Sequence, residues 1–104
     1  GDGSAMYTVQ SLWTMARENL DIVVLIFANQ SYKILQGELT NVGVTNPGKS
    51  ALEMLSLKDP SLDWVSVSKG MGVDAVRVDN IEDLVKNFKH GLKENGPFLI
   101  EVMI

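Results

Sequence analysis

The stretch Ile22-Val23-Val24-Leu25-Ile26-Phe27-Ala28 decides the fold of this chain. It is an unbroken apolar run, rich in β-branched residues, and it is far too short to cross a bilayer. Such runs are typical of strands that are buried on both faces of a parallel sheet. We therefore predict a strand over residues 22–28, buried on both faces of a parallel sheet, in an α/β protein.

A helix is expected immediately before this strand. Ser4 can accept the hydrogen bond that caps a helix start, and the residues after it have helical periodicity. We predict one helix from Ala5 to Asn19. The apolar positions at helical spacing are Val9, Leu12, Trp13, Ala16 and Leu20.

After the strand, Asn29–Tyr32 is a polar break, followed by a short helical or irregular piece through Leu39. Residues 40–62 are rich in Asn, Gly, Pro and Ser, and we interpret them as a long loop carrying one helical turn. Long loops inside compact domains usually serve a function or are mobile. We expect the loop from Thr40 to Ser61 to order over a ligand or against a partner.

The remaining sequence alternates between helix and strand. Asp63 is expected to cap a short helix that ends at Gly70 or Gly72, and Asp79 or Asn80 a longer one. We predict strands over residues 75–78 and 98–104, and the longer helix over residues 81–94. Its apolar face comprises Ile81, Leu84, Val85, Phe88 and Leu92. Trp13, Trp64 and Phe88 are expected to pack in the core.

This alternation predicts right-handed crossovers between parallel strands. The predicted fold class is therefore an α/β, three-layer module with a parallel sheet, formed by residues 1–104 as one domain. The chain opens on Gly1-Asp2-Gly3, which reads like a turn after a strand, and closes inside an apolar strand. We therefore expect a partial module, truncated at its N-terminal strands.

Composition narrows the function classes. The 104 residues carry a net charge of -4, with no run of Lys or Arg that would indicate binding to nucleic acid or a membrane. The chain has no cysteine, which excludes disulfides, thiolate metal sites and a cysteine nucleophile. No signal peptide is visible, so a cytoplasmic location is expected.

Two loops carry the candidate chemistry, because ligands of open parallel sheets bind beyond the carboxyl ends of the strands. The glycines of Gly1–Ala5 allow the backbone to approach a ligand, and the helix start offers N–H groups to a phosphate. Asp2 would repel a phosphate unless a cation lay between them, which indicates Mg²⁺. The Asn29 side-chain oxygen and the Ser31 carbonyl could complete a metal site from the second loop.

These motifs resemble the signature of thiamine diphosphate-dependent enzymes, in which Gly-Asp-Gly is followed by a helix, an apolar strand and Asn. The similarity extends over the whole chain and includes Asn29-x-x-Tyr32, the Asp63-Trp64 helix, the Gly70-x-Gly72 turn and residues 96–102. The pattern is most similar to benzoylformate decarboxylases and to proteins like the large subunit of acetolactate synthase.

The resemblance implies thiamine diphosphate and Mg²⁺ as cofactors. It implies that Asp2, the Asn29 side chain and the Ser31 carbonyl bind the metal, so that the Ser31 side chain would be dispensable. The cofactor-binding set that it implies is Gly1, Asp2, Gly3, Ser4, Ala5, Asn29, Ser31, Tyr32, Lys33 and Ile34. Within this set, the amides and hydroxyl around Gly3, Ser4 and Ala5 would hold the diphosphate, joined by amides near Lys33 and Ile34.

The implied activity is decarboxylation of a small 2-oxo acid, or its carboligation to a second carbonyl. In the family the activating Glu belongs to a pyrimidine-binding domain of the same or a neighbouring subunit, and we predict no catalytic residue in this chain. A homo-oligomer is implied. Two alternatives stay open: a stand-alone cofactor-binding module that needs a partner chain, and a different phosphate-binding α/β protein. The second loop at Asn29 argues against the latter.

Overall fold

The computed structural model describes residues 1–44 and 46–104. The secondary structure begins with α1 (Asp2–Ala5), the 3₁₀ helix η1 (Met6–Thr8), α2 (Ser11–Arg17) and the first strand, β1 (Val23–Ala28). Two helices follow, α3 (Lys33–Asn41) and α4 (Lys49–Met54). The chain then forms α5 (Trp64–Gly70), β2 (Asp74–Val78), α6 (Ile81–Lys93) and β3 (Phe98–Met103).

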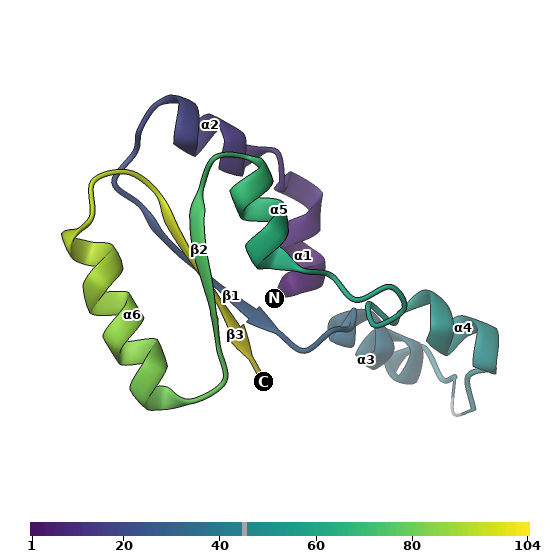
Figure 1. The fold of residues 1–104 in the computed structure, drawn as a ribbon. Helices are drawn as coiled ribbons and strands as arrows, with labels where there is room; N and C mark the ends of the chain where they lie inside the picture. Colours follow the sequence, from purple (N-terminus) through teal and green to yellow (C-terminus); the bar gives the residue numbers. More distant parts are fainter. Residues whose placement is uncertain (45) are drawn as a thin grey trace.

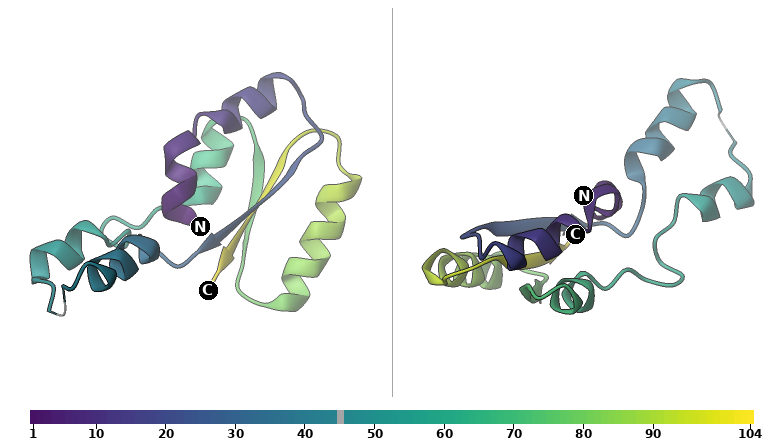
Figure 2. Two further views of the ribbon diagram at one scale, coloured as in Figure 1. Left: turned by 180° about the vertical axis from the view of Figure 1, so that it is seen from behind. Right: turned by 90° about the horizontal axis from the view of Figure 1, so that it is seen from above.

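The three strands form one parallel sheet in the order β1-β3-β2 (Figure 1). β3 lies in the centre, with Val23 of β1 and Asp74 of β2 both in register with Phe98. Helices lie on both faces of the sheet, α1, α2 and α5 on one and α6 on the other (Figure 2). The predicted three-layer α/β fold is confirmed.

Two apolar cores result from the alternation of side chains along β3. On the face of α2 and α5, Leu99 is fully buried and packs in a cluster with Leu12 and Trp64. On the other face, Ile100 is also fully buried, in a cluster against which Leu84 of α6 packs. The strand that is buried on both faces is therefore β3.

The prediction that residues 22–28 are buried on both faces is wrong. β1 pairs with β3 along one side and forms an edge of the sheet in the described part of the chain. Leu25 and Phe27 point to the same face of the sheet as α6, but they do not belong to the apolar cluster around Ile100. Their side chains are therefore 37% and 42% exposed. A continuous apolar run indicates that a strand has apolar residues on both faces, but it does not indicate its place in the sheet.

The predicted single helix over residues 5–19 is interrupted. Helical structure begins at Asp2, so Ser4 lies within α1 and the N-cap is Gly1. The interruption lies at Val9 and Gln10, directly after η1. Thr8 and Val9 are β-branched residues, which have low helix propensity. Leu12 is buried as expected, whereas Trp13, also expected in the core, is 52% exposed. The Arg17 guanidinium lies over the Trp13 ring, with its central carbon 5.3 Å from the ring centroid.

The apolar face of α6 is also less buried than the sequence predicts. Leu84 packs against the sheet, and Gly91 is buried against Phe98. The rest of the stripe is exposed: Ile81, Val85, Phe88 and Leu92. The cap is as predicted, since the Asn80 side chain accepts a hydrogen bond from the Asp83 N–H at 2.8 Å.

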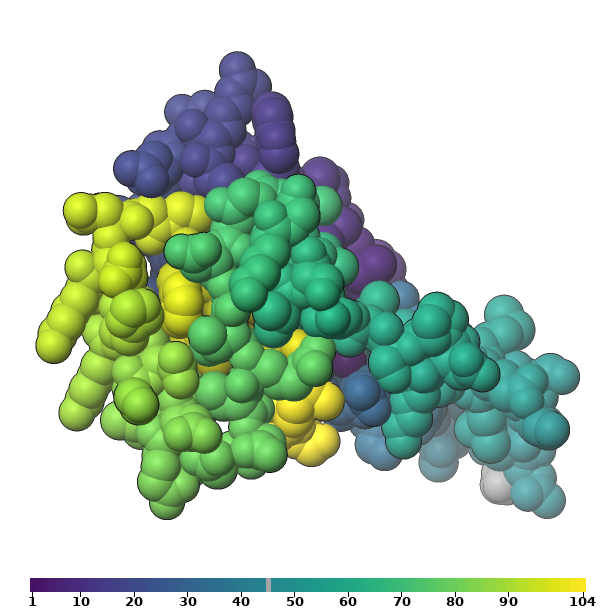
Figure 3. Space-filling model, viewed as in Figure 1, coloured from purple at the N-terminus to yellow at the C-terminus, as the bar shows by residue number. Residues whose placement is uncertain are grey.

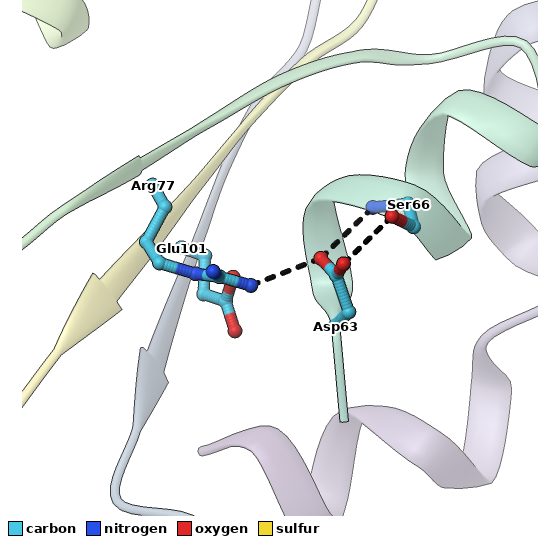
Figure 4. A network of polar contacts seen from close by, with 4 residues as sticks. All are labelled: Asp63, Ser66, Arg77 and Glu101. Carbon is cyan, nitrogen blue, oxygen red and sulfur yellow. Dashed lines mark hydrogen bonds and ion pairs between the residues drawn. The ribbon is translucent and has the colours of Figure 1, made fainter. Parts of the chain in front are cut away.

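Asp63 caps α5, as predicted, and joins it to the sheet. Its carboxylate accepts hydrogen bonds from the Ser66 amide (3.1 Å) and hydroxyl (2.7 Å). The Arg77 side chain of β2 lies between Asp63 and the buried Glu101 of β3 (Figure 4). It forms ion pairs with both carboxylates, from Nη2 to Asp63 at 2.9 Å and from Nε to Glu101 at 2.8 Å. The hydrogen bond that Arg77 donates to the Glu101 carboxylate raises the pKa of Arg77, so the guanidinium remains charged in this network.

The predicted loop over residues 40–62 is partly helical. α3 extends to Asn41, and α4 occupies residues 49–54 without burying a side chain; Thr45 lies outside the described residues. Together α3 and α4 form an arm that projects away from the sheet (Figures 1 and 3). Among the described helices, none is long and apolar enough to cross a membrane.

Candidate functional site

The two loops predicted to carry the chemistry meet at the carboxyl end of β1. Asp2 is 1% exposed and its carboxylate connects them. One carboxylate oxygen accepts a hydrogen bond from the Gly3 N–H at 3.0 Å, and the other accepts one from the Gln30 N–H at 2.8 Å. A buried carboxylate is stable only when it is paired in this way or bound to a cation. Asp2 therefore fixes the distance between the two loops.

A cleft of about 220 Å³ lies between these loops. It is lined by every residue of the predicted set except Ala5: Gly1, Asp2, Gly3, Ser4, Asn29, Ser31, Tyr32, Lys33 and Ile34. Ala5 is set back from the cleft, and its N–H donates to the Gly1 carbonyl at 3.0 Å. The first turn of α1 already uses the Ala5 donor, and the predicted role of this amide in holding the diphosphate stays a prediction.

The second loop turns sharply after Asn29. The Asn29 side-chain oxygen accepts a hydrogen bond from the Ser31 N–H at 3.1 Å, and Gln30 between them has a left-handed backbone with φ of 58°. Non-glycine residues adopt this conformation infrequently, and mostly where the surrounding structure holds them in it. The bond from the Gln30 N–H to Asp2 is one such constraint.

The Ser31 backbone oxygen has no hydrogen-bond partner in the described chain. The Gln30 carbonyl accepts from Leu57, the Tyr32 N–H donates to Leu55, and the Tyr32 carbonyl accepts from Leu35 and Gln36. In addition, the Gln30 N–H donates to Asp2 and the Ser31 N–H donates to Asn29. Among the backbone polar groups of residues 30–32, only the Ser31 carbonyl is therefore without a hydrogen bond in the described chain. Half-buried carbonyls normally have a partner. Ser31 lines the same cleft as Asp2 and Asn29.

Residues with unpaired backbone donors also line the cleft. In the described chain the N–H groups of Ser4, Lys33 and Ile34 have no acceptor, because each lies in the first turn of a helix. The Ser4 side chain is exposed at the cleft, and so is Lys33. The Gly3 amide is already bonded to Asp2. Of the predicted diphosphate donors, Ser4, Lys33 and Ile34 are therefore free, and Gly3 is not.

Close packing between the loops explains the glycine at position 3. A Cβ added to Gly3 would lie 2.7 and 2.8 Å from two ring carbons of Tyr32. The Tyr32 ring therefore covers the first loop at van der Waals distance. The sequence did not reveal this contact, because it joins two residues that are far apart along the chain.

The donor set suits a hard divalent cation. Asp2 offers a carboxylate, Asn29 an amide oxygen and Ser31 an unpaired carbonyl, and Mg²⁺ prefers oxygen ligands with one or two carboxylates and substrate phosphates. Among the described residues, no group of three or more His, Cys, Asp or Glu side chains could hold a metal, so the candidate site relies on amide and carbonyl oxygens beside one carboxylate. The free amides of Ser4, Lys33 and Ile34, which line the same cleft, suit the phosphates that such a cation would accompany.

A parallel α/β module with oxygen ligands and free amides around one cleft belongs to the phosphate-binding α/β proteins. Comparison with known families is more specific: residues 1–102 match the family described as thiamine pyrophosphate enzyme, C-terminal TPP binding domain. The chain belongs to this family of thiamine diphosphate-binding domains, and the family predicted from Gly1-Asp2-Gly3 and Asn29 is confirmed.

Comparison with individual proteins supports the same family. The chain is 44% identical to the "Putative acetolactate synthase large subunit IlvX" of Mycobacterium tuberculosis, over 99% of the chain and 20% of that protein. It is 33% identical to benzoylformate decarboxylase of Pseudomonas aeruginosa, over 98% of the chain and 18% of that protein. The chain thus spans about a fifth of the length of these relatives.

Solved structures give the same result. A thiamine diphosphate-dependent 4-hydroxybenzoylformate decarboxylase of Rhodococcus jostii superposes with a TM-score of 0.86 at 32% identity, covering 99% of this chain and 18% of its own. The benzoylformate decarboxylase of Polynucleobacter necessarius superposes with a TM-score of 0.84 at 28% identity, covering 100% of this chain and 18% of its own.

Proposed function

We propose that this chain binds the diphosphate of thiamine diphosphate through Mg²⁺, as the cofactor-binding part of a 2-oxo acid decarboxylase or carboligase. The observation that carries the metal assignment is the Ser31 carbonyl. It has no hydrogen bond in the described chain, and Ser31 lines one cleft together with the buried Asp2 and with Asn29. Family membership and the named relatives support the cofactor and the reaction class.

Each group has a defined role in this proposal. Asp2, the Asn29 side chain and the Ser31 carbonyl hold the cation. The N–H groups of Ser4, Lys33 and Ile34, with the Ser4 hydroxyl, bind diphosphate oxygens. Thiamine diphosphate, when bound, supplies the stabilised carbanion chemistry that removes CO₂ from 2-oxo acids, and the protein supplies binding and orientation.

The proposal includes a pyrimidine-binding partner domain, from the same or a neighbouring subunit, that supplies the activating carboxylate. The named relatives extend well beyond the region matched here, which leaves room for such a domain in them. Its alternative is a non-catalytic binding module that acts only with a partner chain. Both versions require the same cleft, and they differ in whether the purified protein that carries these residues releases CO₂ from pyruvate or benzoylformate.

Calorimetric titration with thiamine diphosphate, with Mg²⁺ and with chelator, tests the cofactor assignment. Asn29→Leu removes one proposed ligand and is expected to weaken binding in Mg²⁺ about tenfold or more, since charge-assisted oxygen contacts contribute about 1.5–3 kcal/mol. Asn87→Leu is the matched control, because Asn87 lies on α6 and bonds the Asp83 carbonyl of the same helix. Equal affinity in wild-type and Asn29→Leu protein would contradict the assignment.

A further inference from the structure

The Ser31 side chain, which the sequence predicts to be dispensable, is fully engaged in hydrogen bonds. Its hydroxyl accepts a hydrogen bond from the Gln36 side-chain amide at 2.6 Å and donates one to the Leu55 carbonyl at 3.2 Å. Gln36 lies one turn into α3, and Leu55 follows α4. The hydroxyl thus connects the second loop to both ends of the arm.

The backbone around Ser31 is held by the same segment. The Tyr32 N–H donates to the Leu55 carbonyl at 2.8 Å, and the Leu57 N–H donates to the Gln30 carbonyl at 2.9 Å. These bonds flank Ser31 and form an antiparallel bridge between Ser31 and Ser56. We call residues 55–57 the return segment, because here the chain comes back from the arm.

This arrangement determines where the Ser31 carbonyl points. A trans peptide unit is planar, so the Ser31 C=O and the Tyr32 N–H point in opposite directions. Since the Tyr32 N–H points at Leu55, the Ser31 oxygen points away from the return segment. The bonds of the Ser31 hydroxyl to Gln36 and Leu55 resist rotation of this peptide unit.

We infer that Gln36, through the Ser31 hydroxyl, is a positioning residue for the cation site, and that it favours Mg²⁺ over larger cations. The inference rests on the proposed function. Mg²⁺ demands near-ideal octahedral geometry at about 2.1 Å, whereas Ca²⁺ accepts irregular oxygen ligands at about 2.3–2.6 Å. A carbonyl held in one orientation suits the smaller ion, and a loosened carbonyl penalises it more than Ca²⁺.

The test measures how much Mg²⁺, and separately Ca²⁺, is needed for half-maximal binding of thiamine diphosphate to the whole protein, by calorimetry. Gln36→Leu removes the donor, and Ser31→Ala removes the hydroxyl by an independent route. Ser31→Thr retains the hydroxyl and serves as the rescue variant. Asn41→Leu is the matched control, because Asn41 is also an amide on α3, but its bond at 3.2 Å to Glu38 stays within the helix.

Loss of one such hydrogen bond is expected to raise the Mg²⁺ requirement roughly two- to tenfold. In both Gln36→Leu and Ser31→Ala the Ca²⁺ requirement should change less, so that the preference for Mg²⁺ falls. Asn41→Leu and Ser31→Thr should keep the wild-type preference. Equal losses for both ions, or no loss, would overturn the inference while leaving the proposed function intact. Binding that ignores the cation in the wild-type protein would overturn both.

Discussion

Replacement of Gly3 by alanine tests whether the two loops pack against each other as the structure shows. The added Cβ would lie 2.7 and 2.8 Å from two carbons of the Tyr32 ring. Carbon atoms in favourable contact are about 3.5–4.0 Å apart, so the ring must retreat by roughly 1 Å. Tyr32 lies directly between Ser31 and Lys33, and its displacement therefore distorts both the proposed metal ligands and the diphosphate donors.

The cost of such overpacking is typically about 1–3 kcal/mol. If this strain appears in the cofactor complex, the affinity of the whole protein for thiamine diphosphate in saturating Mg²⁺ falls about five- to 150-fold. Calorimetric titration measures this loss. Gly37→Ala is the matched control, because no atom lies within 4 Å of a Cβ added to this glycine of α3. It should leave affinity unchanged.

A double-mutant cycle separates the clash from other effects of the methyl group. In a Tyr32→Ala background the ring is absent, so Gly3→Ala should cost far less than it does in the wild-type protein. Wild-type affinity together with wild-type stability in the single variant Gly3→Ala would refute the packing of the two loops. An equal loss in both backgrounds would show that Tyr32 is not the obstacle.

Three further predictions concern stability and activity. Gly91→Ala should lower the free energy of unfolding by about 1–3 kcal/mol in chemical denaturation, because its Cβ would lie 2.7 Å from Phe98 and 3.1 Å from Val23; unchanged stability would contradict the contact between α6 and β3. Hydrogen bonds from the Ser66 hydroxyl and amide lower the pKa of Asp63, so its contribution to stability should be fully present above its ordinary pKa and lost as the pH falls through the lowered value. The difference in unfolding free energy between the wild type and Asp63→Asn, followed from pH 7 to pH 2, should shrink in acid, and a constant difference would argue against the cap. The 104-residue polypeptide alone should release no CO₂ from pyruvate or benzoylformate above background with saturating cofactor and Mg²⁺; robust turnover would require an activating carboxylate within this chain.

The sequence predicts those parts of the fold that depend on local signals. Asp63 and Asn80 cap helices because each precedes a helical pattern and its side chain can reach back to the backbone. The β1 run is apolar whether the strand is central or at an edge, so the order β1-β3-β2 could not be derived from it. Likewise, the apolar stripe of α6 defines a face of the helix but not what covers it.

In the candidate site, too, the sequence predicts the features that depend on local signals and not those that depend on tertiary contacts. Asp2 and Asn29 could be predicted as neighbours, because Asp2 begins a helix and Asn29 follows a strand, and ligands of parallel α/β sheets bind where strands lead into helices. Gln36 and Leu55 could not, because their contacts with Ser31 depend on how the arm folds back, within a segment whose composition indicates a loop. The sequence could not show that the Ser31 carbonyl has no hydrogen bond in the described chain, because this depends on the partners of the other backbone groups of residues 30–32.

The position of the cation is the most direct test of the account. Crystals of the whole protein grown with thiamine diphosphate and Mn²⁺, which replaces Mg²⁺ and scatters anomalously, would locate the ion. We predict one anomalous peak bounded by a carboxylate oxygen of Asp2, the side-chain oxygen of Asn29 and the carbonyl of Ser31, each about 2.1–2.2 Å away. Bound cofactor with the peak elsewhere, or with the Ser31 carbonyl turned away from it, would contradict the proposed site.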